Sequence, residues 1–363
     1  MINEARLLEN FLTLVRIDSP SGEEGAIAQE LAAHLNRLGL SVHQDTLHNI
    51  VARLPGQGEP ILLAAHMDTV MPGRGVKPVV RDGIVYSDGT TILGSDDKSG
   101  IAIILEILHT ITERNLPHPT IEVLLTVREE VGLAGAKGVD KSLLQSKLGV
   151  SFDTGGVPGS IVVSAPSHNL ISAVVHGKAA HAGAEPELGI NAILVAARAL
   201  VDMPLGRLDD ETTANIGTIK GGLASNIVPD RVELLGEARS RQLTKLEQQT
   251  AKMVKALQVA ADHYSAKVDI EVQRAYDGYN LTESDATVSR LMAACRAAGI
   301  KPALVPSGGG SDANILNASG IQVVNLSTGM RSVHTVNEQI AVADMVACAR
   351  IVMNYIGLSL SSR

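Results

Sequence analysis

Two hydrophobic patterns alternate along the first part of the chain. Apolar or mostly apolar runs at 61–65, 120–127 and 148–152 have the composition of strands that are buried in a sheet. Residues 22–38 carry apolar side chains at the spacing of one helix face, and 98–112 have a helical and strongly apolar pattern. This alternation predicts an α/β fold, in which helices cover a mixed, mostly parallel sheet. Further elements of this region are expected at 3–15 (helix) and at 41–47 and 49–54 (strands).

The pattern changes at about Ile171 and returns after about Leu281. Between these positions a strand, a helix, two strands, a helix and a strand follow one another, which is the order of a ferredoxin-like α+β unit. We therefore expect a core domain formed by residues 1–170 and 281–363, interrupted by a lid or dimerisation domain at 171–280. The expected elements are 172–178, 189–201, 213–220, 232–239, 243–264 and 267–274 in the insertion, and 285–298, 302–305, 321–326 and 338–355 after it.

Composition excludes several classes of function. The formal net charge of −8 provides no basic surface for nucleic acid, and five Tyr and two Phe leave few rings for stacking on bases or sugars. No apolar run reaches the ~18 residues of a membrane helix, and the N-terminus lacks the apolar segment of a signal peptide. Cys295 and Cys348 lie in apolar helical patterns, as core thiols do in a reducing compartment. We therefore expect a cytoplasmic protein that binds neither nucleic acid nor membranes.

One apolar run ends in two polar residues that suit metal chemistry. His66 and Asp68 follow the strand at 61–65, and residues two apart point the same way in an extended chain. The carboxyl end of a buried strand is where open α/β sheets keep their ligand crevices. A histidine beside a carboxylate is typical of a metal ligand with its orienting partner, although polar residues that only end a strand would give the same pair.

Four further groups of polar residues fall at strand ends or in adjoining loops. They are Asp96 with Asp97, Glu129 with Glu130, Asp153, and His334. Each has an ordinary explanation by itself: a helix cap, a solvated strand end, a turn and a structural histidine, respectively. Together, two imidazoles and three carboxylates suit two divalent ions that share one carboxylate. In an adjacent Glu pair, one residue can bind metal while its neighbour takes a proton from the water between the ions.

The same segments resemble the motifs of the di-zinc exopeptidase family, which includes peptidase T, carboxypeptidase G, aminoacylase and succinyl-diaminopimelate desuccinylase. The matching segments run in the family's order and span nearly the whole chain: His66-Met-Asp68, Gly94-Ser-Asp-Asp-Lys-Ser-Gly100, Glu129-Glu-Val-Gly132, Phe152-Asp153 and His334-Thr-Val-Asn-Glu338. Within that family, Asp88-Gly-Thr-Thr and Gly309-Gly-Ser-Asp312 favour peptidase T and its close relatives.

The resemblance implies a role for each residue of this set. His66 would bind one metal ion and be oriented by Asp68, while Asp96 would bridge the two ions. Glu129 would be the general base of the reaction. The remaining metal ligands would be Glu130, Asp153 and His334. The resemblance implies zinc as the metal, although manganese and cobalt suit the same ligands, and members of the family often hold the bond that corresponds to Asp96–Asp97 in cis.

The resemblance extends to residues that would contact the substrate. His181 matches a residue that stabilises the oxyanion in a neighbouring subunit's site, and Asn226 and Arg239 match residues that hold the peptide backbone and its carboxylate. Outside that context, His181 would be a surface-loop residue and Arg239 a snorkelling side chain. Gly309 and Ser311, in a Gly-rich turn, are further candidates for substrate binding. This turn departs from peptidase T, which has Arg at the position of Gly308.

Together these features predict a metal-dependent aminopeptidase that removes the N-terminal residue of short peptides, as a tripeptidase does. The alternative is hydrolysis of an N-acyl amino acid or of a C-terminal residue by the same two-metal site. A non-catalytic peptide-binding protein has no need of Glu129, and adjacent glutamates cannot flank a sugar bond ~5–9 Å apart, as a glycosidase requires. The expected partners are a short peptide substrate and a second copy of the chain, in a homodimer formed through the inserted domain.

Overall fold

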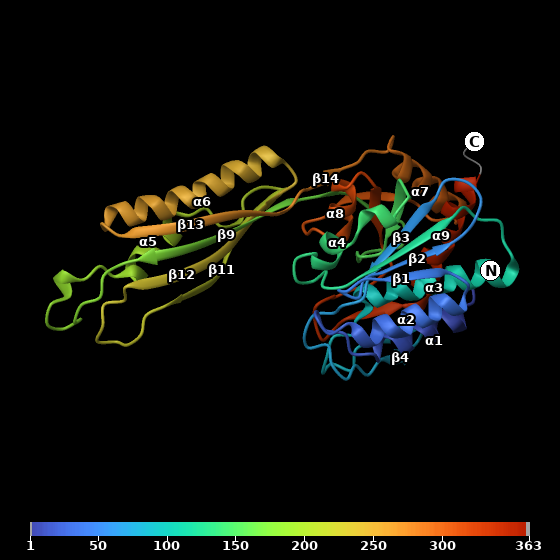
Figure 1. Ribbon diagram of the computed structural model, residues 1–363, viewed down its shortest axis with the longest axis horizontal. Coiled ribbons are helices and arrows are strands. Elements are labelled where there is room, and N and C mark those ends of the chain that lie inside the picture. Colours follow the sequence, from blue (N-terminus) through green and yellow to red (C-terminus); the bar gives the residue numbers. More distant parts are fainter. Residues whose placement is uncertain (1, 361–363) are drawn as a thin grey trace. The chain divides into compact units, whose positions relative to one another are not determined.

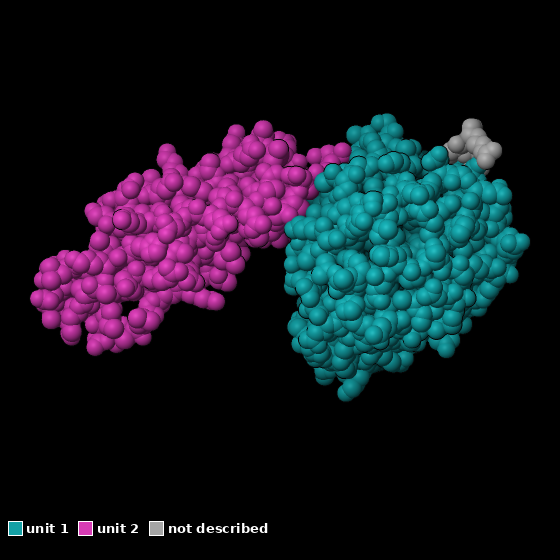
Figure 2. All heavy atoms as spheres, in the orientation of Figure 1, with its two compact units in different colours: residues 1–163, 281–306, 311–363 teal, residues 164–280, 307–310 magenta. Residues whose placement is uncertain are grey.

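The computed structural model describes residues 2–360 (Figure 1). The chain forms two compact units (Figure 2): the first comprises residues 1–163, 281–306 and 311–363, and the second comprises 164–280 and 307–310. The second unit begins before the predicted Ile171 because its first strand already starts at Ser167. The turn 307–310 belongs to it as well, since the Ser307 N–H donates to the Ser164 carbonyl at 2.7 Å.

The central sheet is mixed, as predicted. Its strand order is β1-β2-β6-β3-β7-β16-β8-β14, and β15 pairs with β8. The central strands β6, β3, β7 and β16 pair in parallel, whereas the neighbouring pairs β2–β6 and β16–β8 are antiparallel. The strands are β1 (Ser41–Gln44), β2 (Ile50–Leu54), β3 (Ile61–His66), β6 (Ile121–Thr126), β7 (Leu148–Ser151), β8 (Ser160–Ala165), β14 (Tyr279–Asn280), β15 (Ala303–Pro306) and β16 (Gln322–Leu326).

Helices flank this sheet. They are α1 (Glu4–Val15), α2 (Gly25–Arg37), α3 (Ser95–Arg114), α4 (Ala134–Gly138), α7 (Ala286–Ala297), α8 (Asp312–Ala318) and α9 (Val342–Leu360). The helix α3 is buried along almost its whole length because it packs against α1, α9 and β3. Within residues 2–360, α9 is the one helix that is long and apolar enough to cross a membrane. Its side chains, Tyr355 and Ile351 among them, are part of the core of this unit.

A small sheet that the sequence did not predict lies beside the start of α9. It has the order β17-β5-β4 and consists of β4 (Val79–Arg81), β5 (Ile84–Tyr86) and β17 (Gln339–Ala341). The predicted helix at 338–355 therefore begins only at Val342, because Gln339, Ile340 and Ala341 pair with β5 instead. The sequence also missed α8, which starts directly after the Gly-rich turn, and strand β8.

The second unit has the element order of the predicted ferredoxin-like insertion. It consists of β9 (Ser167–His176), α5 (Ala192–Asp202), β10 (Gly206–Arg207), β11 (Thr212–Gly221), β12 (Arg231–Ser240), α6 (Leu243–His263) and β13 (Lys267–Tyr276). The strand order β10-β11-β12-β9-β13 is antiparallel throughout. Both helices pack on one face of this sheet, and strands β11, β12, β9 and β13 follow the order of a ferredoxin-like unit.

Alternation along β12 shows which side chains of the second unit lie away from its helices. Val232, Leu234 and Ala238 are buried in a core shared with α5 and α6. Because successive side chains of a strand point to opposite faces, Glu237 and Arg239 lie on the face without helices. The predicted carboxylate clamp Arg239 is therefore on the open face of this sheet.

The two cysteines behave as predicted. Cys295 on α7 and Cys348 on α9 are both free and buried in the core of the first unit. Burial raises the pKa of the Cys295 thiol to about 11 and that of Cys348 well above its usual value. Both thiols are therefore held in the protonated, unreactive form at neutral pH.

Candidate metal centre

Three parallel strands bring the predicted donors to one edge of the central sheet. His66 is the last residue of β3, Glu129 and Glu130 follow β6, and Asp153 follows β7. Since β3 pairs in parallel with both β6 and β7, the carboxyl ends of the three strands meet at the same edge. Residues far apart in the sequence therefore lie close together, as in the ligand crevices of other open α/β sheets.

His66 is held in one orientation at this edge. Its side chain is buried, and its Nδ1–H donates to the backbone carbonyl of Asp68 at 3.0 Å. The Asp68 carboxylate lies 3.4 Å from the same nitrogen. On the other side of the ring, Nε2 lies 3.2 Å from Asp96 Oδ1. This arrangement leaves Nε2 as the nitrogen that faces the other donors, and Asp68 as the group that orients the ring.

The Asp68 carboxylate also positions the glutamate pair. Its Oδ1 accepts from the backbone N–H of Glu129 at 2.9 Å and its Oδ2 from that of Glu130 at 3.2 Å. The hydroxyl of Ser21 donates to Oδ2 at 2.6 Å. The sequence reasoning missed Ser21, since a single serine in a loop after a helix carries no pattern that would point to this site.

Asp96 faces both imidazoles of the set. Its Oδ1 lies 3.2 Å from His66 Nε2, and its Oδ2 lies 3.2 Å from His334 Nε2. His334 Nε2 lies 2.8 Å from Glu130 Oε1 as well. Asp96 and Asp97 have non-helical backbone angles at the start of α3, and the peptide bond between them is cis, as the resemblance implied.

Two of the resulting donor groups share one residue. Ligand atoms of His66, Asp96 and Asp153 lie within 4.8 Å of one another, and so do those of Asp96, Glu130 and His334. A third group of the same size joins His66 to Glu129 and Glu130. Imidazole nitrogens and carboxylate oxygens at such spacing are the ligands that zinc, manganese and cobalt take in proteins.

The electrostatics of the cluster favour cations. Burial alone would lower the pKa of His66, but the carboxylates of Asp68 and Asp96 raise it well above its usual value. Hydrogen bonds to Asp96 and Glu130 raise the pKa of His334 to about 10. Burial raises the pKa of Glu129 well above its usual range. Several carboxylates held together out of water need positive charge nearby, which divalent ions would supply.

A further buried carboxylate stands next to this cluster. Asp312, the first residue of α8, accepts a hydrogen bond from the hydroxyl of Thr126 at the end of β6. Burial raises the pKa of Asp312 to about 6. Ser311, a predicted substrate-binding residue, is buried and caps α8: its hydroxyl accepts from the Ala313 N–H at 3.2 Å. This geometry gives Ser311 a structural role.

In the second unit, His181 and Asn226 lie side by side. Residues His181 and Ile227 form an isolated β-bridge, and the Ala182 N–H donates to the Asn226 carbonyl at 3.0 Å. The His181 Nδ1 accepts from the N–H groups of Gly183 at 3.2 Å and Ala184 at 3.0 Å. The loop therefore holds the ring with Nε2 as its available donor on an exposed side chain.

Arg239 forms a different group with residues of the same unit. Its Nε and Nη2 donate to the two oxygens of Glu237 at 3.1 and 3.0 Å, and His168 Nε2 lies 3.1 Å from Glu237 Oε2. Hydrogen bonding to His168, followed by that to Arg239, lowers the pKa of Glu237 to about 2. Gly309 lies beside the guanidinium, since a Cβ on it would stand 3.9 Å from Arg239 Nη1.

The two groups of the second unit lie at opposite ends of the same strands. Arg239 pairs with His168 near one end of β12 and β9, and Arg231 pairs with His176 at the other. At the usual rise per residue, Arg231 and Arg239 are about 26 Å apart. His181 lies in the loops beyond the Arg231 end, where the Gly177 N–H donates to the Asp230 carbonyl at 2.8 Å. The distance between His181 and Arg239 is therefore well over the length of a tripeptide.

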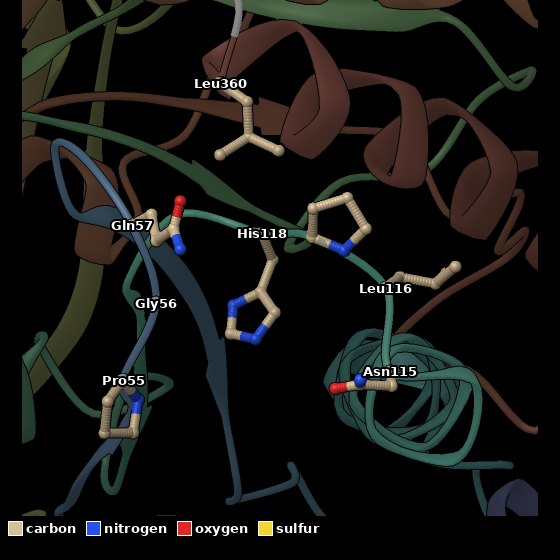
Figure 3. A pocket seen from close by; sticks show the side chains of 8 residues that line it. Pro55, Gly56, Gln57, Asn115, Leu116, His118 and Leu360 are labelled. Atoms are coloured by element: carbon tan, nitrogen blue, oxygen red, sulfur yellow. The ribbon is translucent and has the colours of Figure 1, made fainter.

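A separate pocket of about 440 Å³ lies at the opposite edge of the central sheet (Figure 3). It is next to the end of β2, which pairs with the start of β6, and so lies at the amino ends of β3 and β6. It is lined by Pro55, Gly56, Gln57, Asn115, Leu116, Pro117, His118 and Leu360. Without a carboxylate beside its one imidazole, this pocket lacks the donor chemistry of the metal centre.

Comparison with known proteins places the chain in a family. A model described as peptidase family M20/M25/M40 matches residues 62–357. The chain is 44% identical to the uncharacterised protein YqjE of Bacillus subtilis, over 97% of this chain and 98% of that protein. It is similar to the crystal structures of aminopeptidase PepT from Bacillus cereus (42% identity, 99% of both chains, TM-score 0.90) and of a tripeptidase from Staphylococcus aureus (40% identity, 100% of both chains, TM-score 0.95). The chain therefore belongs to peptidase family M20/M25/M40 and is a peptidase.

Proposed function

We propose that this peptidase is a two-metal aminopeptidase that releases the N-terminal residue of short peptides, as a tripeptidase does. The observation that carries the proposal is the position of Asp96, whose two carboxylate oxygens face His66 and His334 at 3.2 Å each. One carboxylate shared by two donor groups is an arrangement that suits a pair of divalent ions. The names of the two similar crystal structures, an aminopeptidase and a tripeptidase, support the same substrate class.

The chain would hold one ion with His66, Asp96 and Asp153, and the other with Asp96, Glu130 and His334. Zinc suits these ligands, and manganese or cobalt would serve as well. When bound, the ions supply Lewis-acid activation of the peptide carbonyl and of the attacking water. The two buried free thiols are in keeping with a reducing compartment, and we place the enzyme in the cytoplasm.

Glu129 is the proposed general base. Its side chain is buried next to Glu130, and its backbone N–H is held by Asp68. Its carboxylate would take a proton from the attacking water and deliver that proton to the leaving amine. A carboxylate whose pKa is raised by burial is better matched to proton transfer near neutral pH than an exposed one.

The second unit would supply residues that contact the peptide. Arg239 and Gly309 would bind its carboxylate end, Asn226 its backbone, and His181 would stabilise the oxyanion that develops in the transition state. Because His181 and Arg239 lie at opposite ends of one sheet, they cannot both reach one tripeptide from the same chain. We therefore propose a homodimer, formed through the second unit, in which His181 acts on the substrate of the neighbouring copy.

Hydrolysis of Ala-Ala-Ala tests this proposal beside N-acetyl-Ala-Ala-Ala and acetylated amino acids. The chain would be assayed with added zinc, manganese or cobalt and, separately, with a chelator. Cleavage of the first bond of the free-amine peptide only, abolished by the chelator, is the expected result. Preference for the acylated compounds would instead support the N-acyl deacylase or carboxypeptidase alternative. Activity that survives complete removal of metal would contradict the two-metal proposal.

A further inference from the structure

One buried carboxylate outside the donor set binds the loop that carries Asp96. Glu338 is 1% exposed, and its two oxygens accept five hydrogen bonds from this loop. Its Oε2 accepts from the backbone N–H groups of Leu93 at 2.7 Å and Gly94 at 2.8 Å. Its Oε1 accepts from those of Ser95 at 2.7 Å and Asp96 at 3.2 Å, and from the Ser95 hydroxyl at 2.5 Å.

These N–H groups form a concave anion-binding turn immediately before α3. Gly94 has a φ of 75°, in the left-handed region, and this conformation turns successive N–H groups toward the same side. Leu93, Ser95 and Asp96 are buried, so water is a poor substitute as their acceptor. The conformation that presents Asp96 to the two imidazoles therefore depends on a carboxylate at this position.

The same residue belongs to the loop that carries His334. Arg331 and Gln339 exchange backbone hydrogen bonds at 2.9 and 3.1 Å and close this loop at its base. Within it, the Glu338 N–H donates to the Thr335 carbonyl at 3.2 Å. The His334 side chain is 47% exposed, so packing around the imidazole contributes little to its position. Its backbone has a positive φ of 63°. Glu338 thus joins the His334 loop to the Asp96 loop.

We propose that Glu338 is a positioning residue that sets the distance between His334 and Asp96, and through it the affinity of the metal position formed by Asp96, Glu130 and His334. This inference rests on the proposed two-metal function. Both Glu338 oxygens face N–H and O–H donors, so Glu338 itself is not a ligand. The other position shares Asp96 but takes its remaining donors, His66 and Asp153, from the ends of β3 and β7, so the loss of Glu338 should weaken it less.

Zinc titration of the full-length Glu338→Gln variant tests this role. Glutamine has the same length, but its NH₂ group cannot accept from the N–H groups of the loop. We expect one of two zinc ions to bind about 10–100-fold more weakly than in the wild type, as found for residues that orient metal ligands. The zinc content after dialysis should then fall from two ions to one per chain. Excess zinc should restore activity, which it should not do for His334→Ala.

Glu122→Gln is the matched control. Glu122 is also fully buried in the first unit and accepts from the N–H groups of Gln145 and Ser146, from the Ser146 hydroxyl and from Arg53. It lies near the amino end of β6, away from the metal centre. We expect Glu122→Gln to lower the unfolding temperature and to bind two zinc ions with wild-type affinity. Loss of one ion from this variant as well would overturn a specific role for Glu338.

A second variant covers the case in which Glu338→Gln does not fold. Ser95→Ala removes one of the five hydrogen bonds and should weaken the same zinc ion by a smaller factor. A folded Glu338→Gln with two ions of wild-type affinity would overturn the inference, and so would Ser95→Ala with unchanged zinc binding if it is the only folded variant. The wild-type titration reports on the proposed function separately: a wild type with one zinc ion would contradict the two-metal proposal itself.

Discussion

The proposed metal donors of the first unit and the proposed substrate residues of the second are held in different ways. In the first unit, residues from five distant segments meet, and each donor group fits within 4.8 Å. In the second, His181 and Arg239 lie at opposite ends of one antiparallel sheet. Parallel strand ends collect distant residues at one point, whereas long antiparallel strands separate the residues at their two ends. One chain can therefore complete the donor set but cannot bring both substrate groups to one short peptide.

The largest effect is expected from the first unit, where Glu129→Ala would remove the proposed base. Turnover should fall by about 10³-fold, because the attacking water loses its proton acceptor. Bound zinc should stay at the wild-type level, since the two groups that share Asp96 do not include Glu129. Steady-state kinetics and metal analysis of the same preparation would measure both quantities. Glu130→Ala is the control that should lose metal as well as turnover, and a near-normal rate for Glu129→Ala would rule out the base assignment.

Mixing two impaired variants tests whether His181 acts on the substrate of the neighbouring copy. His181→Ala should lower turnover by about 10²–10³-fold, as expected for the loss of an oxyanion donor. If His181 acts on the neighbouring copy, a mixed dimer of His181→Ala and Glu129→Ala contains one complete site. Random exchange of equal amounts should then restore about one quarter of the wild-type rate. Activity of the mixture that stays at the sum of the two variants would place His181 in its own chain's site.

The other end of the second unit should contribute through substrate affinity. Arg239→Ala should raise KM for Ala-Ala-Ala by about 10–100-fold, the loss of a charge-assisted hydrogen-bonded pair, with a much smaller change for the C-terminal amide. Arg231 is a matched control, because it is on the same strand and pairs with Glu233 as Arg239 pairs with Glu237. Arg231→Ala should leave KM unchanged for both peptides. Equal losses for the free acid and the amide would show that Arg239 does not bind the carboxylate.

The contrast between the units also explains how far sequence alone could go. The proximity of the candidate donors was predictable because each follows an apolar run or opens a helix, and parallel strand ends bring His66, Glu130 and Asp153 together. The roles of Ser21 and Glu338 were not predictable, because a hydroxyl or carboxylate that bonds to backbone groups across the fold leaves no periodic signal. Ser311 shows the limit of a local pattern, since a Ser after glycines suits a substrate turn and a helix cap equally, and in the structure its hydroxyl caps α8.

Short elements were the weakest part of the prediction of the fold. β4, β5 and β17 contain three residues each. This is too few for the alternation of apolar and polar residues in a strand to be distinguished from chance. β17 mattered most, because its pairing with β5 delays the start of α9 and fixes the base of the His334 loop. In the second unit the long strands and helices were predicted within a few residues of their ends. The strands are long enough to show alternation, and the helices contain several turns of regular apolar spacing.

The smallest effect concerns two imidazoles of the first unit in opposite surroundings. Carboxylates raise the pKa of His334 to about 10, whereas burial and the neighbouring His109 lower that of His34 to about 4. His34 Nε2 lies 2.9 Å from His109 Nε2 between α2 and α3. In the unfolded chain the pKa is about 6.5, so between pH 6.5 and 4 the unfolded state binds more protons. This pair should therefore lower the stability as the pH falls through that range, and should have no such effect above it.

His34→Gln should remove part of this pH dependence. In metal-free protein, where release of zinc by acid does not contribute, the variant should lose about 1–2 °C less in unfolding temperature between pH 7 and pH 5 than the wild type. The effect is small because His34 is only half-buried and water screens its charge. His43→Gln, at an exposed position on β1, should follow the wild type across the same range. If His34→Gln and the wild type lost the same amount of unfolding temperature, the pKa of His34 would not differ between the folded and unfolded chain. The pKa of His334 would then be the only one of the two that the fold shifts.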